Sequence, residues 1–238
     1  MARGLVAFDR GRIKEAANLT GIDEAGRGCL AGPVVAAAVR CSRAFYSTAW
    51  CRKHARGVDD SKRLSAKRRA AIVDRFKEAC HEEWIHIGMG LATVEEIERH
   101  NIFGATVLAM RRALDSVHPE GEGSLFDQAV TCSGPVLVDG RPIRRFPCAH
   151  EGIVKGDRKS LAIALAGIHA KEYRDSIMMK MDQEYPQYGF VDHKGYGTKR
   201  HLLAILEFGP AACHRPSFLV KLKARREERG EAFQDSLF

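Results

Sequence analysis

Short runs of apolar residues alternate along this chain with longer stretches in which apolar positions recur every three or four residues. The short runs predict β-strands, which we place at 20–25, 34–40, 85–91 and 135–138. The longer stretches predict helices, and one of them follows a potential capping residue, Ser65. Its basic residues are expected to face solvent: Lys67, Arg68, Arg69, Arg75 and Lys77. Strands that alternate with helices indicate an α/β fold.

Three further helical patterns complete the predicted layout. Thr93 and Glu96 have the spacing of a capping box at the start of a short helix, and helical spacing continues after them. A long pattern starts near Asp157, and another starts at Thr198 and stops at Gly209, which Pro210 follows. All of these helices are expected to form the scaffold around the strands.

Two segments lack this periodicity. The segment 116–134 contains Gly, Ser and Pro and predicts a surface loop, whereas the charged run 221–231 is expected to be helical or loose. There is no internal repeat. We therefore expect one α/β domain over residues 1–209, followed by a helical C-terminal extension and tail over residues 210–238.

The composition is that of a folded, soluble protein, with 45% hydrophobic and 29% charged residues. The longest apolar run, 30–39, is too short to span a bilayer and too far from the start for a signal peptide, so we expect no membrane association. Seven scattered cysteines show no metal-ligand spacing. They predict reduced thiols, a cytoplasmic location and no structural zinc, and we expect a monomer.

The net charge of +8 favours a polyanionic partner such as nucleic acid, although it could also serve solubility alone. Many of the basic residues fall within the segment 52–69. That segment could contact phosphates or could be a solvated helix face.

Candidate chemistry begins where an apolar strand ends in Asp23 and Glu24. Adjacent acids are usually solvated, but apolar neighbours suggest burial, and a bound cation would compensate two buried anions. Strict alternation would send the two side chains to opposite faces, so a shared site requires the strand to end or bulge there. Gly26 and Gly28 would permit that break, and Arg27 lies between them on a turn that a ligand could approach closely.

Two more carboxylates occupy comparable positions. Asp139 ends the run 135–138, and Asp157 precedes the long helix. Taken singly, Asp139 also suits an Asp-Gly turn and Asp157 also suits a helix N-cap. Together, four carboxylates would suffice to hold the hard cations Mg²⁺ or Mn²⁺ for phosphodiester hydrolysis. The chain lacks a phosphate loop, a nucleophile elbow and an HExxH zinc helix.

Several blocks of the chain resemble one family, ribonuclease HII. They occur in that family's order between about residues 20 and 220: GIDEAGRGCLAGP (21–33), DSKRLS (60–65), VDG (138–140), KGD (155–157), YPQYGFVDHKGYGT (185–198) and HRPSF (214–218). The resemblance implies a ribonuclease H-like mixed β-sheet flanked by helices, with the catalytic domain over residues 1–209. It also implies an endonuclease that cuts the RNA strand of RNA/DNA hybrids, and ribonucleotides embedded in duplex DNA, leaving 3′-OH and 5′-phosphate ends.

The resemblance assigns roles to individual residues. The catalytic and metal ligands, for two divalent ions, fall on the acids already singled out: Asp23, Glu24, Asp139 and Asp157. The ribose 2′-OH, which separates RNA from DNA, would be sensed by a group of four residues: Gly26, Arg27, Gly28 and Tyr196. Family position and charge suggest further phosphate contacts, although a solvated or structural role also suits each one: Lys62, His193, Lys194 and Arg215.

The sequence departs from the family in three places. Cys29 stands where the family usually has proline, the run 164–169 differs from the usual small-residue pattern, and the stretch 40–58 is longer than typical. None of these removes a proposed ligand, but the last puts the substrate footprint in doubt.

Two alternatives are weighed against this interpretation. Ribonuclease HIII shares the carboxylates but usually carries an N-terminal binding domain, for which the roughly twenty residues before Asp23 leave no room. A catalytically silent hybrid-binding module would gain nothing from clustered negative charge.

The last five residues, Gln234–Phe238, resemble the short Gln-x-x-Leu-Phe peptides that bacterial replication proteins insert into the sliding clamp. A frayed terminus is the other interpretation of this segment. If the resemblance holds, a sliding clamp is a second partner beside the nucleic acid.

Overall fold

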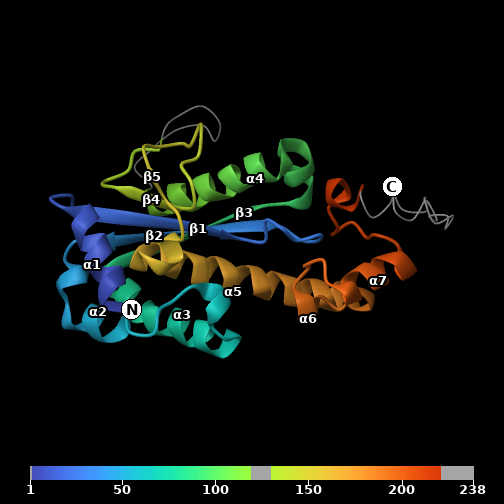
Figure 1. The fold of residues 1–238 in the computed structure, drawn as a ribbon, viewed down its shortest axis with the longest axis horizontal. Helices are drawn as coiled ribbons and strands as arrows, with labels where there is room; N and C mark the ends of the chain where they lie inside the picture. The colour runs from blue at the N-terminus through green and yellow to red at the C-terminus, as the bar shows by residue number, and fades with distance from the viewer. Residues whose placement is uncertain (1, 119–129, 221–238) are drawn as a thin grey trace.

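The computed structural model describes residues 2–118 and 130–220 (Figure 1). Most of the predicted loop at 116–134, the charged run at 221–231 and the tail Gln234–Phe238 lie outside these residues. The sheet has five strands in the order β3-β2-β1-β4-β5. Their bounds are β1 (Asn18–Ala25), β2 (Val34–Ser42), β3 (Ile85–Ala92), β4 (Val136–Asp139) and β5 (Glu151–Ile153).

The sheet is mixed, as expected for a ribonuclease H-like fold. The strands β1, β2 and β3 pair antiparallel, with Ile22 opposite Ala38, whereas β4 runs parallel to β1 and β5 runs parallel to β4. All four predicted strands are confirmed. The fifth, β5, is only three residues long and has no alternating apolar pattern, so the sequence did not reveal it.

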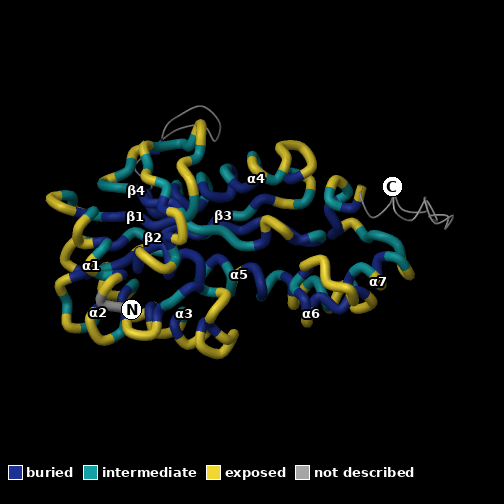
Figure 2. The backbone as a smooth tube through the Cα atoms, viewed as in Figure 1, coloured by how far each residue is buried: buried dark blue, intermediate teal, exposed yellow. Residues whose placement is uncertain are grey.

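Helices cover both faces of this sheet. They are α1 (Ala2–Ile13), α2 (Ala49–His54), α3 (Ala66–His81), α4 (Val94–Val117), α5 (Leu161–Glu184), α6 (Phe190–His193) and α7 (Lys199–Phe208). One face packs on α4, and the other packs on α5 with α1, α2 and α3 beyond it (Figure 1). The strands and the first half of α5 are the most buried parts of the chain (Figure 2).

The predicted caps are confirmed. Ser65 caps α3, Thr198 caps α7, and Thr93 and Glu96 form the capping box of α4. The long helix α4 contains a break at Asn101, whose φ of 56° is left-handed, which explains why the sequence predicted a short helix and then a second pattern.

Two features of the helices differ from expectation. The N-terminal helix α1 was not predicted. Arg69 does not face solvent, because its guanidinium is buried against α5, where it pairs with Glu172 at 2.6 Å and with Asp175 at 3.3 Å. Arg69 also donates to the carbonyl oxygens of Ser61 and Leu64, so it fixes the DSKRLS segment on α5.

Residues after α7 return to the body of the molecule. A bridge joins His214 to Ala31, and Cys213 and Leu219 pack with Phe190 and Ile205 in a small cluster of their own. The segment 211–220 is therefore attached to the β1–β2 connection. Across the described ranges no helix combines the length and apolarity needed to cross a membrane, and all seven cysteines are free, as the sequence predicted.

Candidate functional site

The topology of the sheet brings the four singled-out carboxylates to one edge. Asp23 and Glu24 lie near the end of β1, and Asp139 is the last residue of the parallel neighbour β4. Because parallel strands end at the same edge of a sheet, these side chains are neighbours. Asp157 lies in a 3₁₀ turn, η3 (Gly156–Arg158), between β5 and α5. Ser160 caps α5, so Asp157 is not its N-cap.

The strand neither ends nor bulges between Asp23 and Glu24, contrary to expectation. The strand β1 keeps its pairing with β2 as far as Ala25. On its other side the pairing with β4 stops at Ile22, so the last residues of β1 have no partner strand on that side. The negative charge of Glu24 still raises the pKa of Asp23, and that of Asp139 raises the pKa of Glu24, although alternation sends adjacent side chains to opposite faces.

A glycine on α5 makes room for Asp23. A Cβ built on Gly167 would overlap Oδ2 of Asp23. Glycine in the middle of a helix costs about 1 kcal/mol relative to alanine, so its presence here marks a close approach. The sequence offered this signal as a single glycine within an apolar helical pattern, but only the structure shows which side chain occupies the space.

The carboxylates are partly held by the backbone. Asp139 Oδ1 accepts a hydrogen bond from Gly156 N at 2.6 Å, and Asp23 Oδ1 accepts one from Glu24 N at 2.7 Å. Glu24 is paired with Arg27 at 3.1 Å. Within 2–118 and 130–220, no three His, Cys, Asp or Glu side chains already form a metal-binding group. The site is thus a set of neighbouring acids rather than a closed coordination shell.

Electrostatics distinguish these acids from ordinary surface carboxylates. Burial and the charges of Glu24 and Asp139 hold the pKa of Asp23 well above its usual range. Burial also raises the pKa of Glu24, against the opposing effect of Arg27, and burial together with Asp139 and Asp60 raises the pKa of Asp157. Such crowding of buried anions is what a bound cation relieves.

Lys62 lies close enough to act on this cluster. It is exposed on a 3₁₀ turn, η2 (Ser61–Arg63), and its charge offsets a small part of the rise in the pKa values of Glu24 and Asp157. The turn is capped by Asp60, which pairs with Arg158 at 2.8 Å. Asp60 and Arg158, which the sequence analysis did not single out, therefore tie Lys62 to the turn that carries Asp157.

The turn at 26–28 and Tyr196 also meet in space. An isolated bridge pairs Cys29 with Tyr196, and Leu30 N donates to Gly195 O at 2.8 Å. Tyr196 is 38% exposed as a residue, so its side chain is available to a ligand. The two sequence-distant parts of the predicted ribose sensor are neighbours.

The two glycines of the turn differ. Gly26 has a φ of +94°, and a Cβ there would run into the Arg174 guanidinium, so glycine is required. Gly28 has open space around it. Arg27 is exposed and its carbonyl oxygen accepts from Arg215.

Two buried arginines build this part of the site. Arg174 on α5 donates to the carbonyl oxygens of Ala31, Pro33 and Lys194 at 2.8–3.0 Å. Arg215 donates to Gly32 O and Arg27 O, also at 2.7–3.0 Å. Both side chains are fully buried, and every hydrogen bond found for them within the described ranges goes to a main-chain carbonyl.

This geometry changes the interpretation of three residues expected to contact phosphate. Arg215 is enclosed, so its placement supports positioning of the turn rather than direct contact. His193 is buried, with Nε2 bonded to Tyr188 O and Nδ1 accepting from Gly195 N. Lys194 is half-buried and donates to Val191 O at 2.6 Å. Of the four residues, only Lys62 is both exposed and electrostatically coupled to the acids.

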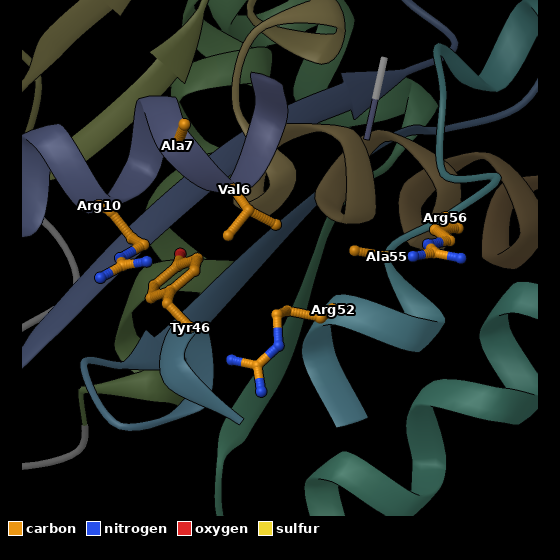
Figure 3. A pocket seen from close by; sticks show the side chains of 7 residues that line it. All are labelled: Val6, Ala7, Arg10, Tyr46, Arg52, Ala55 and Arg56. Carbon is orange, nitrogen blue, oxygen red and sulfur yellow. The ribbon is translucent and has the colours of Figure 1, made fainter. Parts of the chain in front are cut away.

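The basic segment 52–69 divides into separate surfaces. Lys62 lies beside the carboxylates and Arg69 is buried, whereas Arg52 and Arg56 line a cavity of about 360 Å³ against α1. In that cavity Arg10 and Arg52 lie on either side of Tyr46, with Arg56 further along (Figure 3). The segment is therefore not one continuous phosphate-binding surface.

The fold and the site together define a class. A mixed sheet in the order 3-2-1-4-5 with helices on both faces is the ribonuclease H-like fold, and in this chain it places acids at the edge where β1 and β4 end. A family model for ribonuclease HII matches residues 20–221. The chain belongs to the ribonuclease HII family. It is an endoribonuclease that cleaves the RNA of RNA/DNA hybrids and ribonucleotides embedded in DNA.

Individual relatives agree with this assignment. A ribonuclease HII of Synechococcus sp. (strain RCC307) is 45% identical over 205 residues, which are 85% of this chain and 91% of the relative. Two solved structures share the fold. The ribonuclease HII of a PCNA complex from Archaeoglobus fulgidus has a TM-score of 0.63 at 21% identity, covering 92% of this chain and 100% of that one. Bst-RNase HIII in complex with Mn²⁺ has a TM-score of 0.60 at 18% identity, covering 91% and 71%.

Proposed function

We propose that Asp23, Glu24, Asp139 and Asp157 hold the divalent cations, Mg²⁺ or Mn²⁺, that the cleavage reaction uses. The donor set fits such an ion, because carboxylate oxygens are the ligands that hard cations prefer. The observation that carries the proposal is the convergence of these carboxylates: Asp139 accepts from Gly156 N at 2.6 Å in the turn that carries Asp157, and Asp23 lies against Gly167. The charges of Glu24, Asp139 and Asp157 each raise the pKa of Asp23. A relative, Bst-RNase HIII, was solved with Mn²⁺.

The protein's own groups divide the work of the reaction. Bound cations would supply an activated water and neutralise charge on the departing oxygen. Asp139 accepts a hydrogen bond from Gly156 N, and Asp23 accepts one from Glu24 N and packs against Gly167. Both carboxylates are therefore fixed before substrate arrives. Attack by water on the phosphate would leave 3′-OH and 5′-phosphate ends.

Selectivity for RNA would come from the turn at 26–28 and from Tyr196. The positive φ of Gly26 turns the backbone beside an exposed tyrosine ring, which can pack on a sugar. Backbone groups of this turn could hydrogen-bond the 2′-OH, the group that DNA lacks. Arg174 donates to Lys194 O in the Tyr196 loop, and Arg215 donates to Arg27 O in the turn, so the two arginines fix both segments.

Lys62 is the phosphate contact that the structure best supports, and Arg27 is a second, because its side chain is exposed beside Glu24. His193, Lys194 and Arg215 are better explained as residues that position the Tyr196 loop. Replacing Lys62 by Met should weaken hybrid binding and reduce its salt dependence.

A cleavage assay tests this proposal. The protein is incubated with a duplex containing one ribonucleotide, a full RNA/DNA hybrid and an all-DNA duplex, each with Mg²⁺, Mn²⁺ or EDTA. We expect cleavage 5′ of the ribonucleotide with either metal, and none of the all-DNA duplex. Products ending in a 2′,3′-cyclic phosphate would exclude a water nucleophile, and metal-independent cleavage would exclude the carboxylate site. Binding without any cleavage would favour a silent hybrid-binding module.

We also propose that Gln234–Phe238 binds the replication sliding clamp. The support is the Gln-x-x-Leu-Phe pattern and the archaeal relative solved as a complex with PCNA. Tethering to a clamp on DNA would raise the local concentration of enzyme near a rare ribonucleotide. Calorimetry with a bacterial clamp should show binding by the full chain and none after deletion of these five residues. Cleavage of short duplexes should be unchanged, and no binding by the full chain at high micromolar concentration would refute the proposal.

A further inference from the structure

Two of the seven cysteines form a pair outside the cleavage site. Cys132 precedes β4 and Cys148 precedes β5, and a backbone hydrogen bond from Val130 N to Pro147 O, at 2.8 Å, brings the two segments together. Cys132 Sγ lies 3.8 Å from Val130 O, at this link, and both cysteine side chains pack against the same apolar cluster. Each thiol has the largest effect on the pKa of the other. Both side chains are half-buried, whereas four other cysteines are fully enclosed. The pair is therefore both adjacent and within reach of small oxidants.

The interaction between the two thiols affects them unequally. It lowers the pKa of Cys132, and together with burial it raises the pKa of Cys148. The thiolate is the form of cysteine that attacks an oxidant. Cys132 is thus the more reactive partner, with Cys148 in place to complete a disulfide.

We propose that Cys132 and Cys148 form a peroxide-sensitive pair that closes to a disulfide. The Cys132 thiolate attacks one oxygen of hydrogen peroxide, the O–O bond breaks, and the released hydroxide takes up a proton to become water. The Cys132 sulfenic acid is then attacked by the sulfur of Cys148, which loses its proton as the S–S bond forms and a second water leaves. Two thiols and one peroxide give one disulfide and two waters.

The position of the pair sets the consequence of oxidation. The strands β4 and β5 are parallel, and both cysteines precede them, so the disulfide would join the amino ends of the two strands. Asp139 lies at the opposite, carboxyl end of β4. The disulfide would therefore fix the β4–β5 connection while leaving the carboxylate edge unchanged, an expectation that rests on the proposed role of Asp139.

Peptide mapping of the full chain tests the pair directly. After brief treatment with hydrogen peroxide and alkylation of free thiols, we expect a disulfide-linked peptide containing Cys132 and Cys148, lost on reduction with dithiothreitol. Because the closed loop restricts the unfolded chain, the oxidised protein should unfold about 5 °C higher than the reduced one. Cleavage of a single-ribonucleotide duplex should be retained after oxidation.

Variants separate this pair from general oxidation. Cys132→Ser and, separately, Cys148→Ser should abolish both the linked peptide and the rise in melting temperature. Cys80→Ser, which removes another half-buried thiol, should change neither. A different disulfide, or no disulfide at peroxide concentrations that oxidise exposed methionine, would overturn the proposal. If turnover falls as the linked peptide forms, the disulfide acts on the cleavage site and the expected separation of the two is wrong. If a serine variant fails to fold, peptide mapping of the wild-type protein still decides whether the disulfide forms.

Discussion

Replacing the buried Arg174 by methionine should weaken both stability and ribose selectivity. The side chain is fully enclosed, and its three hydrogen bonds to Ala31, Pro33 and Lys194 carbonyls measure 3.0, 3.0 and 2.8 Å. Losing a charged donor leaves each buried carbonyl unsatisfied, at about 1–2 kcal/mol apiece. The variant no longer has to bury a guanidinium near the one of Arg215, and this gain offsets part of the loss. We expect a net loss of about 3 kcal/mol, which a domain of ordinary stability survives.

Urea unfolding and a cleavage assay together measure this effect. Arg174→Lys keeps the charge but cannot satisfy all three carbonyls with the same geometry, so it should recover only part of the stability. Because Lys194 O and Gly195 anchor the Tyr196 loop, we expect ribose-over-deoxyribose selectivity in Arg174→Met to fall at least about tenfold, a change equivalent to about 1.4 kcal/mol. Arg43→Met, an exposed arginine paired only with Glu15 among the described residues, is the matched control and should stay within about 0.5 kcal/mol of wild type. A loss below about 1 kcal/mol with unchanged selectivity in Arg174→Met would refute the reasoning.

Three further predictions address other parts of the structure. Gly167→Ala should reduce turnover at least about tenfold by displacing the Asp23 carboxylate, while a hybrid-binding assay shows near-normal affinity; full turnover would remove the close approach from the account. Burial raises the pKa of Asp9 from 3.8 to about 6, so its stabilising effect is present below pH 4 and is lost as the pH rises through 6. The stability of Asp9→Asn relative to wild type should therefore increase by about 2 kcal/mol between pH 4 and pH 7, and a constant difference in urea titrations would contradict this. Tyr196→Phe should keep more activity than Tyr196→Ala because the ring packs mainly through its apolar face, whereas equal losses would point to the hydroxyl.

The sequence predicted the central strands and the helix caps because those signals are local. Periodicity over a few residues placed β1 to β4, and side-chain spacing placed the caps of α3, α4 and α7. The acids Asp23, Asp139 and Asp157 were found as carboxylates that end strands or precede a helix. Their neighbourhood became visible only from the parallel pairing of β1 with β4.

The burial of the arginines behind the turn at 26–28 and the Tyr196 loop could not be predicted in this way, and Arg215 was expected to contact phosphate. Arg174 and Arg215 are charged, and charge predicts exposure; their burial depends on carbonyls contributed by the β1–β2 connection and the loop before α7. The same argument covers Arg69, whose partners lie more than a hundred residues away on α5. A buried cation is specified by the fold around it rather than by its neighbours in sequence.

The most direct test of the carboxylate site is single-turnover cleavage by Asp139→Asn. The substrate is a duplex with one embedded ribonucleotide, with Mg²⁺ or Mn²⁺ present, and hybrid affinity is measured in parallel. Asp74→Asn, an exposed carboxylate of α3 paired with Lys77, is the matched control. Asp139→Asn should lose at least about a hundredfold in rate, or about 2.7 kcal/mol of transition-state stabilisation, while binding stays close to wild type because Lys62 and Arg27, the proposed phosphate contacts, are untouched. Cleavage at the wild-type rate by Asp139→Asn would contradict the assignment of the site.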